Sequence, residues 1–324
     1  MTRQESGIGL AARAVGTAAL LLAGGCAPGQ DARTPEPGPV SATQGTELAL
    51  AWRPDARPCQ QYASFDVPGG ADTEGFGVND LGQIVGRWTD ADGNVHGFLR
   101  QPTGRYETID APGATFTAPV DINNLGTVVG RYLDADGVSH GFALRQGRYQ
   151  TIDAPGAADT RPRGIDDQGR ITGDFRRDDG VEHGFTIDAR GFAQVDVPGS
   201  ATTDVWDIND LGIRVGDWSD DEGNVHGYVL RAGSFSTFDY PGVRFATSAR
   251  RINLWGAIVG EFTESETTGD HGFLREGDHF RQIDFPGAAE TDAMAINLWG
   301  LIVGNFLDSD GAEHGFVLKD CHAD

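Results

Sequence analysis

Residues 117–156 read TAPVDINNLGTVVGRYLDADGVSHGFALRQGRYQTIDAPG, and this stretch decides the fold. It holds four short segments rich in β-branched and aromatic residues, separated by turn signals that contain Gly or Asp-Gly. Such segments are typical of strands, and the 3.6-residue apolar period of a helix is absent. We therefore predict four strands, near residues 118–123, 128–133, 140–144 and 149–153.

The same pattern occurs six times, so it is an internal repeat. Its marker is a His-Gly-aromatic tripeptide that recurs every 43–45 residues, and an Asp-x-Pro-Gly tetrapeptide also appears six times. The marker histidines are His96, His140, His183, His226, His271 and His314. Four strands in about 43 residues is the period of a propeller blade. The sequence therefore predicts an all-β fold, a six-bladed β-propeller of four-stranded blades.

The repeat resembles the HAF repeat family, exported bacterial proteins named for a His-Ala-Phe tripeptide that follows an Ile-Asn-x-x-Gly-x-Val-Val-Gly stretch. The resemblance spans Asp66 to Val317, with Gly in place of Ala in every tripeptide. It implies an exported repeat protein, and the family has no agreed activity or catalytic residues. The resemblance thus implies more about the fold than about the function.

Connection lengths predict the order of strands in a blade. A tight link such as 144–149 makes a hairpin, whereas a longer link such as 112–117 crosses to the next blade. The Ile-Asn strand is then innermost and the Asp-x-Pro-Gly strand outermost. One outermost strand, 60–66, precedes every inner strand, and the last repeat lacks one. We therefore predict that the N-terminal strand completes the last blade and closes the ring.

Two cysteines fall where this last blade lacks its hairpin turn. Cys59 lies seven residues before Asp66, and Cys321 lies seven residues after His314, so the two occupy adjacent positions. In an exported protein this predicts a Cys59–Cys321 disulfide. Closing so long a loop would contribute about 4–5 kcal/mol in the chain-entropy model. The alternative is two unrelated thiols.

The N-terminal residues are typical of a targeting sequence rather than of a folded element. Arg3 and Arg13 make the start basic, and a short apolar run ends in LLAGGC at residues 21–26, which resembles a bacterial lipobox. We predict a signal peptide over 1–25, a lipidated Cys26, a Pro-rich tether over 26–58, the propeller over 59–321 and a tail over 322–324. The protein would be a cell-envelope lipoprotein, periplasmic or on the outer surface, or secreted if it is not lipidated.

The charge balance excludes two classes of partner. The 324 residues include 25 basic and 48 acidic ones, for a net charge of −23. Nucleic acids and anionic lipid surfaces both require basic patches, so we expect no nucleic acid and contact with a membrane only through the lipid anchor. Three cysteines form no zinc-like cluster. We expect a soluble monomer.

Repeated acidic turns raise the question of a metal. Closely spaced carboxylates before Gly suit calcium, but Asp-Gly is also an ordinary choice for a hairpin turn, and both interpretations stay open. The residues are Asp90, Asp92, Asp134, Asp136, Asp220, Glu222, Asp308 and Asp310. The marker histidines recur once per blade and do not converge, so we expect each to make a structural hydrogen bond.

A few positions vary freely between otherwise similar repeats, near the start of the inner strands. Variation inside a regular repeat is typical of residues that face a ligand or solvent. The ligand-binding candidates are Glu74, Arg161, Arg163, Asp204, Trp206, Arg250 and Asp292. The three arginines would offer a side for anions. We expect Trp255 and Trp299, at the opposite end of the channel, to be buried caps rather than a sugar-stacking platform.

No catalytic motif is present, so the function follows from the architecture. We expect an exported, surface-anchored, non-catalytic binding or scaffold module whose ligand is a protein, a glycan or a small molecule. One alternative is a calcium-dependent hydrolase or lactonase with its site at the channel mouth. Another is a multivalent carbohydrate-binding propeller, which would need the same polar and aromatic residues between every pair of blades. No cofactor is firmly indicated by the sequence, and calcium is a candidate at the acidic turns and in the hydrolase alternative.

Overall fold

The computed structural model describes residues 59–321, which are all-β and contain twenty-four strands. The predicted signal peptide (1–25), the tether (26–58) with Cys26, and the tail (322–324) lie outside the described residues. Within the described range, no helix is long and apolar enough to cross a bilayer.

The strands follow the sequence repeats. The first half comprises β1 (Cys59–Phe65), β2 (Asp72–Val78), β3 (Ile84–Thr89), β4 (Val95–Arg100), β5 (Tyr106–Ile109), β6 (Phe116–Ile122), β7 (Val128–Leu133), β8 (Ser139–Arg145), β9 (Arg148–Ile152), β10 (Asp159–Ile165), β11 (Ile171–Arg176) and β12 (Glu182–Asp188). The second half comprises β13 (Gly191–Val195), β14 (Thr202–Ile208), β15 (Arg214–Ser219), β16 (Val225–Arg231), β17 (Ser234–Phe238), β18 (Ala246–Ile252), β19 (Ile258–Thr263), β20 (His271–Glu276), β21 (His279–Ile283), β22 (Glu290–Ile296), β23 (Leu301–Leu307) and β24 (Glu313–Cys321).

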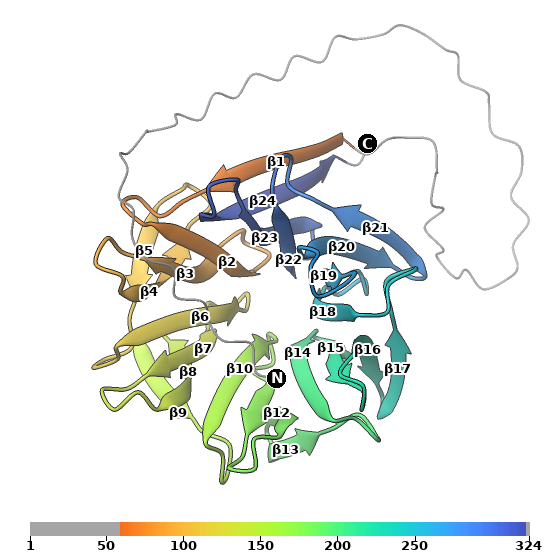
Figure 1. Cartoon of the computed structure of the whole chain (residues 1–324). Helices are drawn as coiled ribbons and strands as arrows, with labels where there is room; N and C mark the ends of the chain where they lie inside the picture. The colour runs from red at the N-terminus through yellow and green to blue at the C-terminus, as the bar shows by residue number, and fades with distance from the viewer. Residues whose placement is uncertain (1–58, 322–324) are drawn as a thin grey trace, which may run out of the picture. The chain divides into compact units, whose positions relative to one another are not determined.

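Consecutive strands pair into antiparallel, four-stranded blades, as in β10-β11-β12-β13. The strands predicted in the second repeat are present as β6 to β9, with every boundary within two residues of the prediction. The Ile-Asn strands lie at the inner side of the blades, nearest the centre around which the blades are arranged (Figure 1). They are β2, β6, β10, β14, β18 and β22. The predicted order of strands within a blade is therefore confirmed.

The first strand pairs with the last. Strand β1 runs antiparallel to β24, with register from Cys59↔Cys321 to Phe65↔Gly315, and the sheet order is β1-β24-β23-β22. The two cysteine positions are thus partners along the backbone. The disulfide itself stays a prediction.

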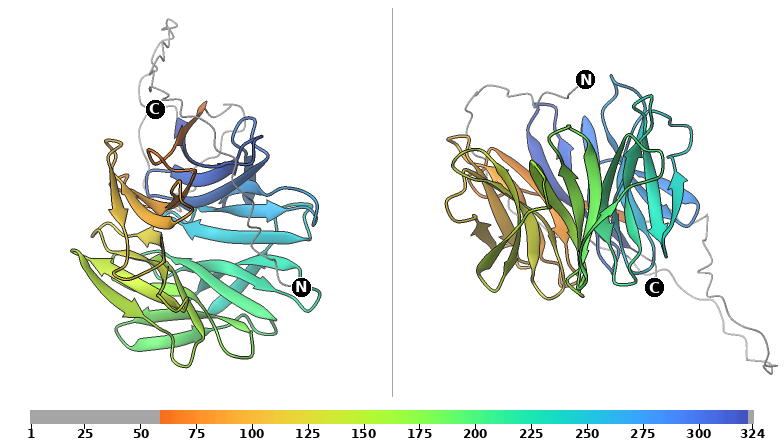
Figure 2. Two further views of the ribbon diagram at one scale, coloured as in Figure 1. Left: turned by 60° about the vertical axis from the view of Figure 1, so that its left-hand side comes forward. Right: turned by 90° about the horizontal axis from the view of Figure 1, so that it is seen from below.

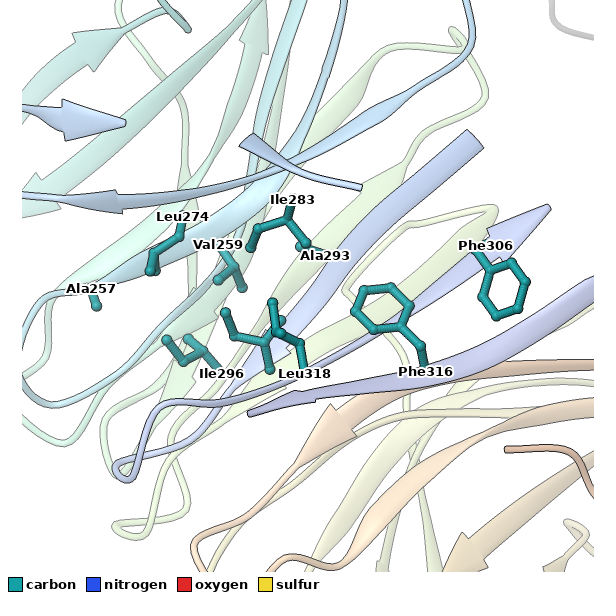
Figure 3. Close-up of a cluster of buried hydrophobic side chains, with 10 residues drawn as sticks. Ala257, Val259, Leu274, Ile283, Ala293, Ile296, Phe306, Phe316 and Leu318 are labelled. Atoms are coloured by element: carbon teal, nitrogen blue, oxygen red, sulfur yellow. The ribbon is translucent and has the colours of Figure 1, made fainter. Parts of the chain in front are cut away.

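The core lies between neighbouring blades, because each sheet packs its faces against the next. The aromatic residue of each tripeptide is at most 1% exposed: Phe98, Phe142, Phe185, Tyr228, Phe273 and Phe316. Figure 3 shows one such cluster, in which Val259 and Leu274 meet Phe316 and Leu318 of the next blade. The close approach of the backbones of β2 and β3 also explains a repeated glycine. A Cβ on Gly86 would lie 1.9 Å from the carbonyl oxygen of Glu74.

The antiparallel register gives the blades two ends, which Figure 2 shows as two layers of loops. The start of β2 pairs with the end of β3, so the loop 66–71 and the turn 90–93 share what we call the crossing end. The turns that join the first two strands of each blade lie at the other end, which we call the Asx end. Those turns begin at Asn79, Asn123, Asp166, Asn209, Asn253 and Asn297.

Candidate functional site

The marker histidines make the structural hydrogen bonds expected of them, at the crossing end. In every repeat the imidazole Nδ1 lies 2.8–3.2 Å from the aspartate of an Asp-x-Pro-Gly strand. The pairs are His96–Asp110, His140–Asp153, His183–Asp196, His226–Asp239, His271–Asp284 and His314–Asp66. Each pair ties the third strand of a blade to its outermost strand.

Four of these histidines have a second acidic neighbour in the Asp-Gly turn. In the first repeat, His96 Nε2 lies 3.4 Å from Asp90 Oδ2, and the same contact recurs at His140, His226 and His314. Partial burial opposes protonation of His96, but hydrogen bonds and charge from Asp110 and Asp90 exceed that effect and raise its pKa. The pKa of the other three histidines is raised in the same way.

The candidate calcium residues in these turns are used by the turn itself. Asp90 Oδ1 accepts the backbone N–H groups of Asp92 and Asn94, and its Oδ2 accepts the Asn94 amide. The turns at Asp134, Asp220 and Asp308 repeat the backbone bonds. The second carboxylates, Asp92, Asp136, Glu222 and Asp310, are exposed. Among the described residues no three His, Cys, Asp or Glu side chains are grouped so that they could hold a metal ion. Calcium binding stays a prediction.

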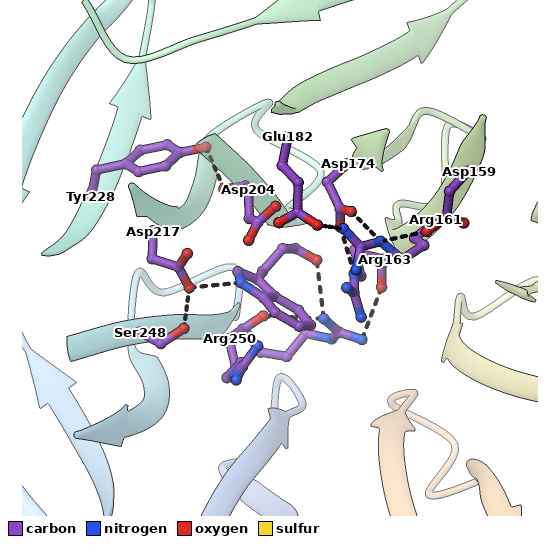
Figure 4. Close-up of polar contacts among 12 residues, drawn as sticks. Asp159, Arg161, Arg163, Asp174, Glu182, Asp204, Asp217, Tyr228, Ser248 and Arg250 are labelled. Carbon is purple, nitrogen blue, oxygen red and sulfur yellow. Dashed lines mark hydrogen bonds and ion pairs between the residues drawn. The ribbon is translucent and has the colours of Figure 1, made fainter. Parts of the chain in front are cut away.

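Four of the seven ligand-binding candidates, Arg161, Arg163, Trp206 and Arg250, form one internal network between the third, fourth and fifth repeats. The carboxyl group of Asp204 lies beside this network (Figure 4). Asp174 is 0% exposed and forms ion pairs with two arginines. Its Oδ2 lies 2.5 Å from Arg161 Nε, and its Oδ1 lies 2.7 Å from Arg163 Nε. Arg161 also pairs with Glu182. Burial and the neighbouring charge of Asp174 raise the pKa of Asp204 well above its ordinary value.

Trp206 is the aromatic centre of that network. It is 9% exposed and lies between the guanidinium groups of Arg163 and Arg250, whose central carbons are 4.1 and 3.7 Å from a ring centroid. The Trp206 indole N–H donates to Asp217 at 2.8 Å, and Arg250 pairs with Glu261. The arginines expected to offer a side for anions therefore have acidic partners within the protein.

The other two candidates, Glu74 and Asp292, line a cavity of about 50 Å³ at the crossing end, where β2 meets β22 to β24. Asp292 also adjoins the network, because the charges of Glu261 and Arg250 act on it. Glu74 accepts two hydrogen bonds from Arg87, at 2.5 and 2.9 Å. Burial and the charge of Glu74 raise the pKa of Glu313, in the same cavity, to about 7. Burial also raises the pKa of Asp292 well above its ordinary value.

Arg251 lies where the inner strands of five repeats meet, a feature not predicted from the sequence. Its guanidinium donates to backbone carbonyls of five inner strands, at 2.8–3.5 Å. The acceptors are the carbonyl oxygens of Phe76, Val120, Arg163, Trp206 and Arg250. Free carbonyls on the inner edge of a sheet need partners, and one cation supplies them here.

Two aspartates complete this central group. Asp121 Oδ2 and Asp207 Oδ2 accept the backbone N–H groups of Ile165 and Ile252 of the following blades. Burial raises the pKa of Asp207 to about 7, although the charge of Arg251 opposes the shift. The sequence signal was the residue before the Ile or Val that recurs in every repeat. This residue differs in chemical type between repeats: Gly77, Asp121, Gly164, Asp207, Arg251 and Ala295.

On the Asx side of Arg251 lies a cavity of about 110 Å³, which we call the cup. A series of side-chain hydrogen bonds runs around it from blade to blade. The Nδ2 groups of Asn79, Asn123, Asn209, Asn253 and Asn297 donate to the backbone carbonyls of Asn123, Asp166, Asn253, Asn297 and Asn79. In the third repeat, where Asp166 cannot donate, Arg170 binds Asp166 and reaches the carbonyls of Asn209 and Asp210.

The residue that follows each pair of cup-lining residues at the tip of an Asx turn belongs to what we call the rim of the cup. The rim exposes large apolar side chains, and here one expectation is wrong. Trp255 and Trp299 are each 75% exposed, so they are not buried caps. The equivalent residues Leu81, Leu125 and Leu211 are 62–67% exposed, and the third repeat has Gln168. The turn explains the exposure, because the Asn253 and Asn297 side chains accept the backbone N–H groups of the two tryptophans and hold these positions at the tips.

No protein-family model matches the chain, and no curated protein matches it. Among solved structures it is similar to AofleA from Arthrobotrys oligospora (TM-score 0.47, 14% identity, 81% of this chain and 84% of that one). It is also similar to the Aleuria aurantia lectin, described as a six-bladed β-propeller with a novel fucose recognition mode (TM-score 0.47, 10% identity, 80% and 91%). A third is a gluconolactonase from Xanthomonas campestris (TM-score 0.43, 13% identity, 82% and 96%). All three TM-scores are below 0.5, so none of them bears on the function.

Proposed function

We propose that residues 59–321 form a six-bladed β-propeller, closed by its N-terminal strand, that acts as a non-catalytic binding module. Two observations support the closed ring. Strand β1 pairs with β24, and the blade-to-blade hydrogen bonds around the cup return from Asn297 to Asn79. Both contacts join the last blade to the first, as a closed ring requires.

The observation that carries the binding function is the cup with its exposed apolar rim. Exposed apolar patches on a soluble protein mark interaction sites, and polar clefts at loop ends are where ligands bind. At the crossing end, Arg161, Arg163 and Trp206 are held in internal contacts, and the cavity lined by Glu74 and Asp292 is smaller than the cup, about 50 Å³. Our proposal thus moves the ligand from the crossing end, where the sequence analysis expected it, to the cup.

Two alternatives are less well supported. A calcium-dependent hydrolase would hold its cation in the channel, but the guanidinium of Arg251 occupies that position and would repel a cation. A multivalent lectin would present the same aromatic residue at each repeat, but the rim has Trp only at 255 and 299. A single binding surface fits this asymmetry better than six equivalent sites.

Export, anchoring and covalent closure are parts of the same proposal. We propose a cell-envelope lipoprotein attached through Cys26 and related to the HAF repeat proteins, with a Cys59–Cys321 disulfide. The backbone register that makes these two cysteines partners supports the disulfide. Such a protein would display the domain on a tether and bind a protein, glycan or small-molecule ligand as a monomer.

Hydrogen exchange on the purified protein tests the proposed surface. The protein is mixed in turn with soluble glycans, short peptides, organic cations and organic anions, and amide protection is mapped by mass spectrometry. A ligand should protect the Asx-end turns, such as 79–82 and 297–300, and the Trp255→Ala/Trp299→Ala variant should lose that protection. Val138→Ala, an exposed apolar residue at the crossing end, is the control. Protection confined to crossing-end turns such as 90–93, or calcium-dependent turnover of an ester or lactone, would overturn the proposal.

A further inference from the structure

The cup is chemically two-sided, which indicates the kind of ligand it takes. The second residue of each Asx turn is Asp80, Asn124, Asp167 and Asp210 in the first four repeats, and Leu254 and Leu298 in the last two. The polar and acidic side thus spans four consecutive blades. The apolar side spans the two blades whose rim residues are Trp255 and Trp299.

Carboxylates dominate the polar side. Six aspartates line the cup, but Asp166 is paired with Arg170, and Asp121 and Asp207 lie beside Arg251. The carboxylates left to face a ligand are those of Asp80, Asp167 and Asp210. The Asn124 side-chain amide donates to the carboxylates of Asp80 and Asp167, at 2.8 and 2.9 Å. These two hydrogen bonds hold the two carboxylates on either side of Asn124. Burial and the charges of Asp167 and Asp166 raise the pKa of Asp210, as expected where negative charge accumulates.

The apolar side is held in place before any ligand arrives. The Trp299 indole N–H donates to the carbonyl oxygen of Asp80 at 3.0 Å, and the Trp255 indole N–H donates to that of Leu298 at 3.2 Å. Each ring therefore bridges to the next blade while most of its surface stays in solvent. Trp299 also lies directly beside the acidic side. Fixed aromatic rings lose little conformational entropy on binding, which favours their use as anchors.

We propose that the cup receives a lysine or arginine side chain from a peptide segment of a protein partner, with the apolar neighbours of that side chain resting on Trp255 and Trp299. The inference rests on the proposed function and names its ligand class. Charge complementarity selects the occupant. A cation offsets the carboxylates and also attracts the faces of the indole rings, whereas an anionic or purely apolar group would leave the acidic side uncompensated.

Four capped peptides test this directly: GLRLG, its charge-reversed form GLELG, its neutral form GLQLG, and GSRSG without the apolar neighbours. Affinities are measured by titration calorimetry on the purified protein at low salt. GLRLG should bind at least five-fold more tightly than each of the other three, and 0.5 M salt should weaken it. The Asp80→Asn/Asp167→Asn/Asp210→Asn variant and the Trp255→Ala/Trp299→Ala variant should each lose at least five-fold in affinity for GLRLG. The matched control, Asp92→Asn/Asp136→Asn/Asp310→Asn, removes three exposed crossing-end carboxylates and should change nothing.

The outcomes separate this inference from the proposed function. If GLQLG binds as tightly as GLRLG and depends on the two tryptophans, the charge argument is overturned and the cup remains the binding surface. If no peptide binds while a glycan protects the Asx-end turns, the ligand class alone is overturned. If GLRLG binds equally to both cup variants and loses affinity only in the crossing-end control, the inference and the proposed function are both overturned.

Discussion

Residues that differ between repeats have opposite surroundings at the two ends of the domain. At the crossing end, departures from the repeat compensate one another: Arg161 and Arg163 share Asp174, and Trp206 lies between Arg163 and Arg250. At the Asx end, the Leu-to-Trp changes at 255 and 299 leave the rings in solvent. Variation between repeats is therefore not by itself a sign of a ligand, since the residues that vary at the crossing end contact one another.

Replacing the central cation should have the largest effect on stability. Arg251→Met leaves five carbonyl oxygens without their donor and Asp121 and Asp207 without a compensating charge. Breaking such a buried group costs about 3–5 kcal/mol. The measurement is the free energy of unfolding in urea. Adding Asp207→Asn to Arg251→Met should recover part of the loss, and a single variant as stable as the wild type would show that the channel does not need its cation.

The two classes of tryptophan should differ sharply. Trp206→Ala removes a buried ring and two cation–π contacts, and we expect a loss of about 3–5 kcal/mol. Trp299→Ala removes a ring that is 75% exposed and one hydrogen bond to a carbonyl, and we expect a loss of about 1 kcal/mol or less. Urea unfolding of both variants provides the comparison. Equal losses would remove the distinction between the two ends.

The covalent closure is tested by mass analysis of unreduced peptides, which should contain the Cys59 and Cys321 peptides linked together. Cys59→Ser should then lower the free energy of unfolding under oxidising conditions by about 4–5 kcal/mol, less any strain in the disulfide. The same variant should make little difference once the wild type is reduced. Finding both cysteines alkylated in unreduced protein would rule the disulfide out.

The smallest effect is the pH dependence of the crossing end. The folded pKa of His96, His140, His226 and His314 is raised, so their stabilisation is complete below about pH 6.5 and is lost as the pH rises through the folded pKa values. Each should contribute about 0.2–1 kcal/mol. Replacing all four by Gln should flatten the fall in stability between pH 6 and pH 8. An unchanged pH profile would mean that the histidines are not charged in the folded protein.

The repeated features could be predicted because each strand has its own local signal. The strands of the second repeat follow from β-branched segments and turn residues, and their boundaries agree within two residues. The pairing of β1 with β24 follows from counting strands per repeat. These inferences need only information that lies within one repeat or at the chain's ends.

The site could not be predicted in the same way, because it depends on what six separate repeats bring to one axis. Arg251 occurs in one repeat, and its importance comes from carbonyls contributed by four other repeats as well as its own. The exposure of Trp255 and Trp299 depends on turn geometry, which outweighs the general tendency of tryptophan to be buried. Comparing the residue before each repeated Ile or Val would have pointed to Arg251.

The central claim is that ligands bind at the Asx end, and the indole N–H resonances of the tryptophans test it most directly. In ¹⁵N-labelled protein titrated with GLRLG, the account predicts that the signals of Trp255 and Trp299 shift while those of Trp88, Trp206 and Trp218 stay in place. Trp88 and Trp218 lie against His96 and His226 at the crossing end, so they report on the other face. Shifts confined to Trp88, Trp206 or Trp218 would contradict the account.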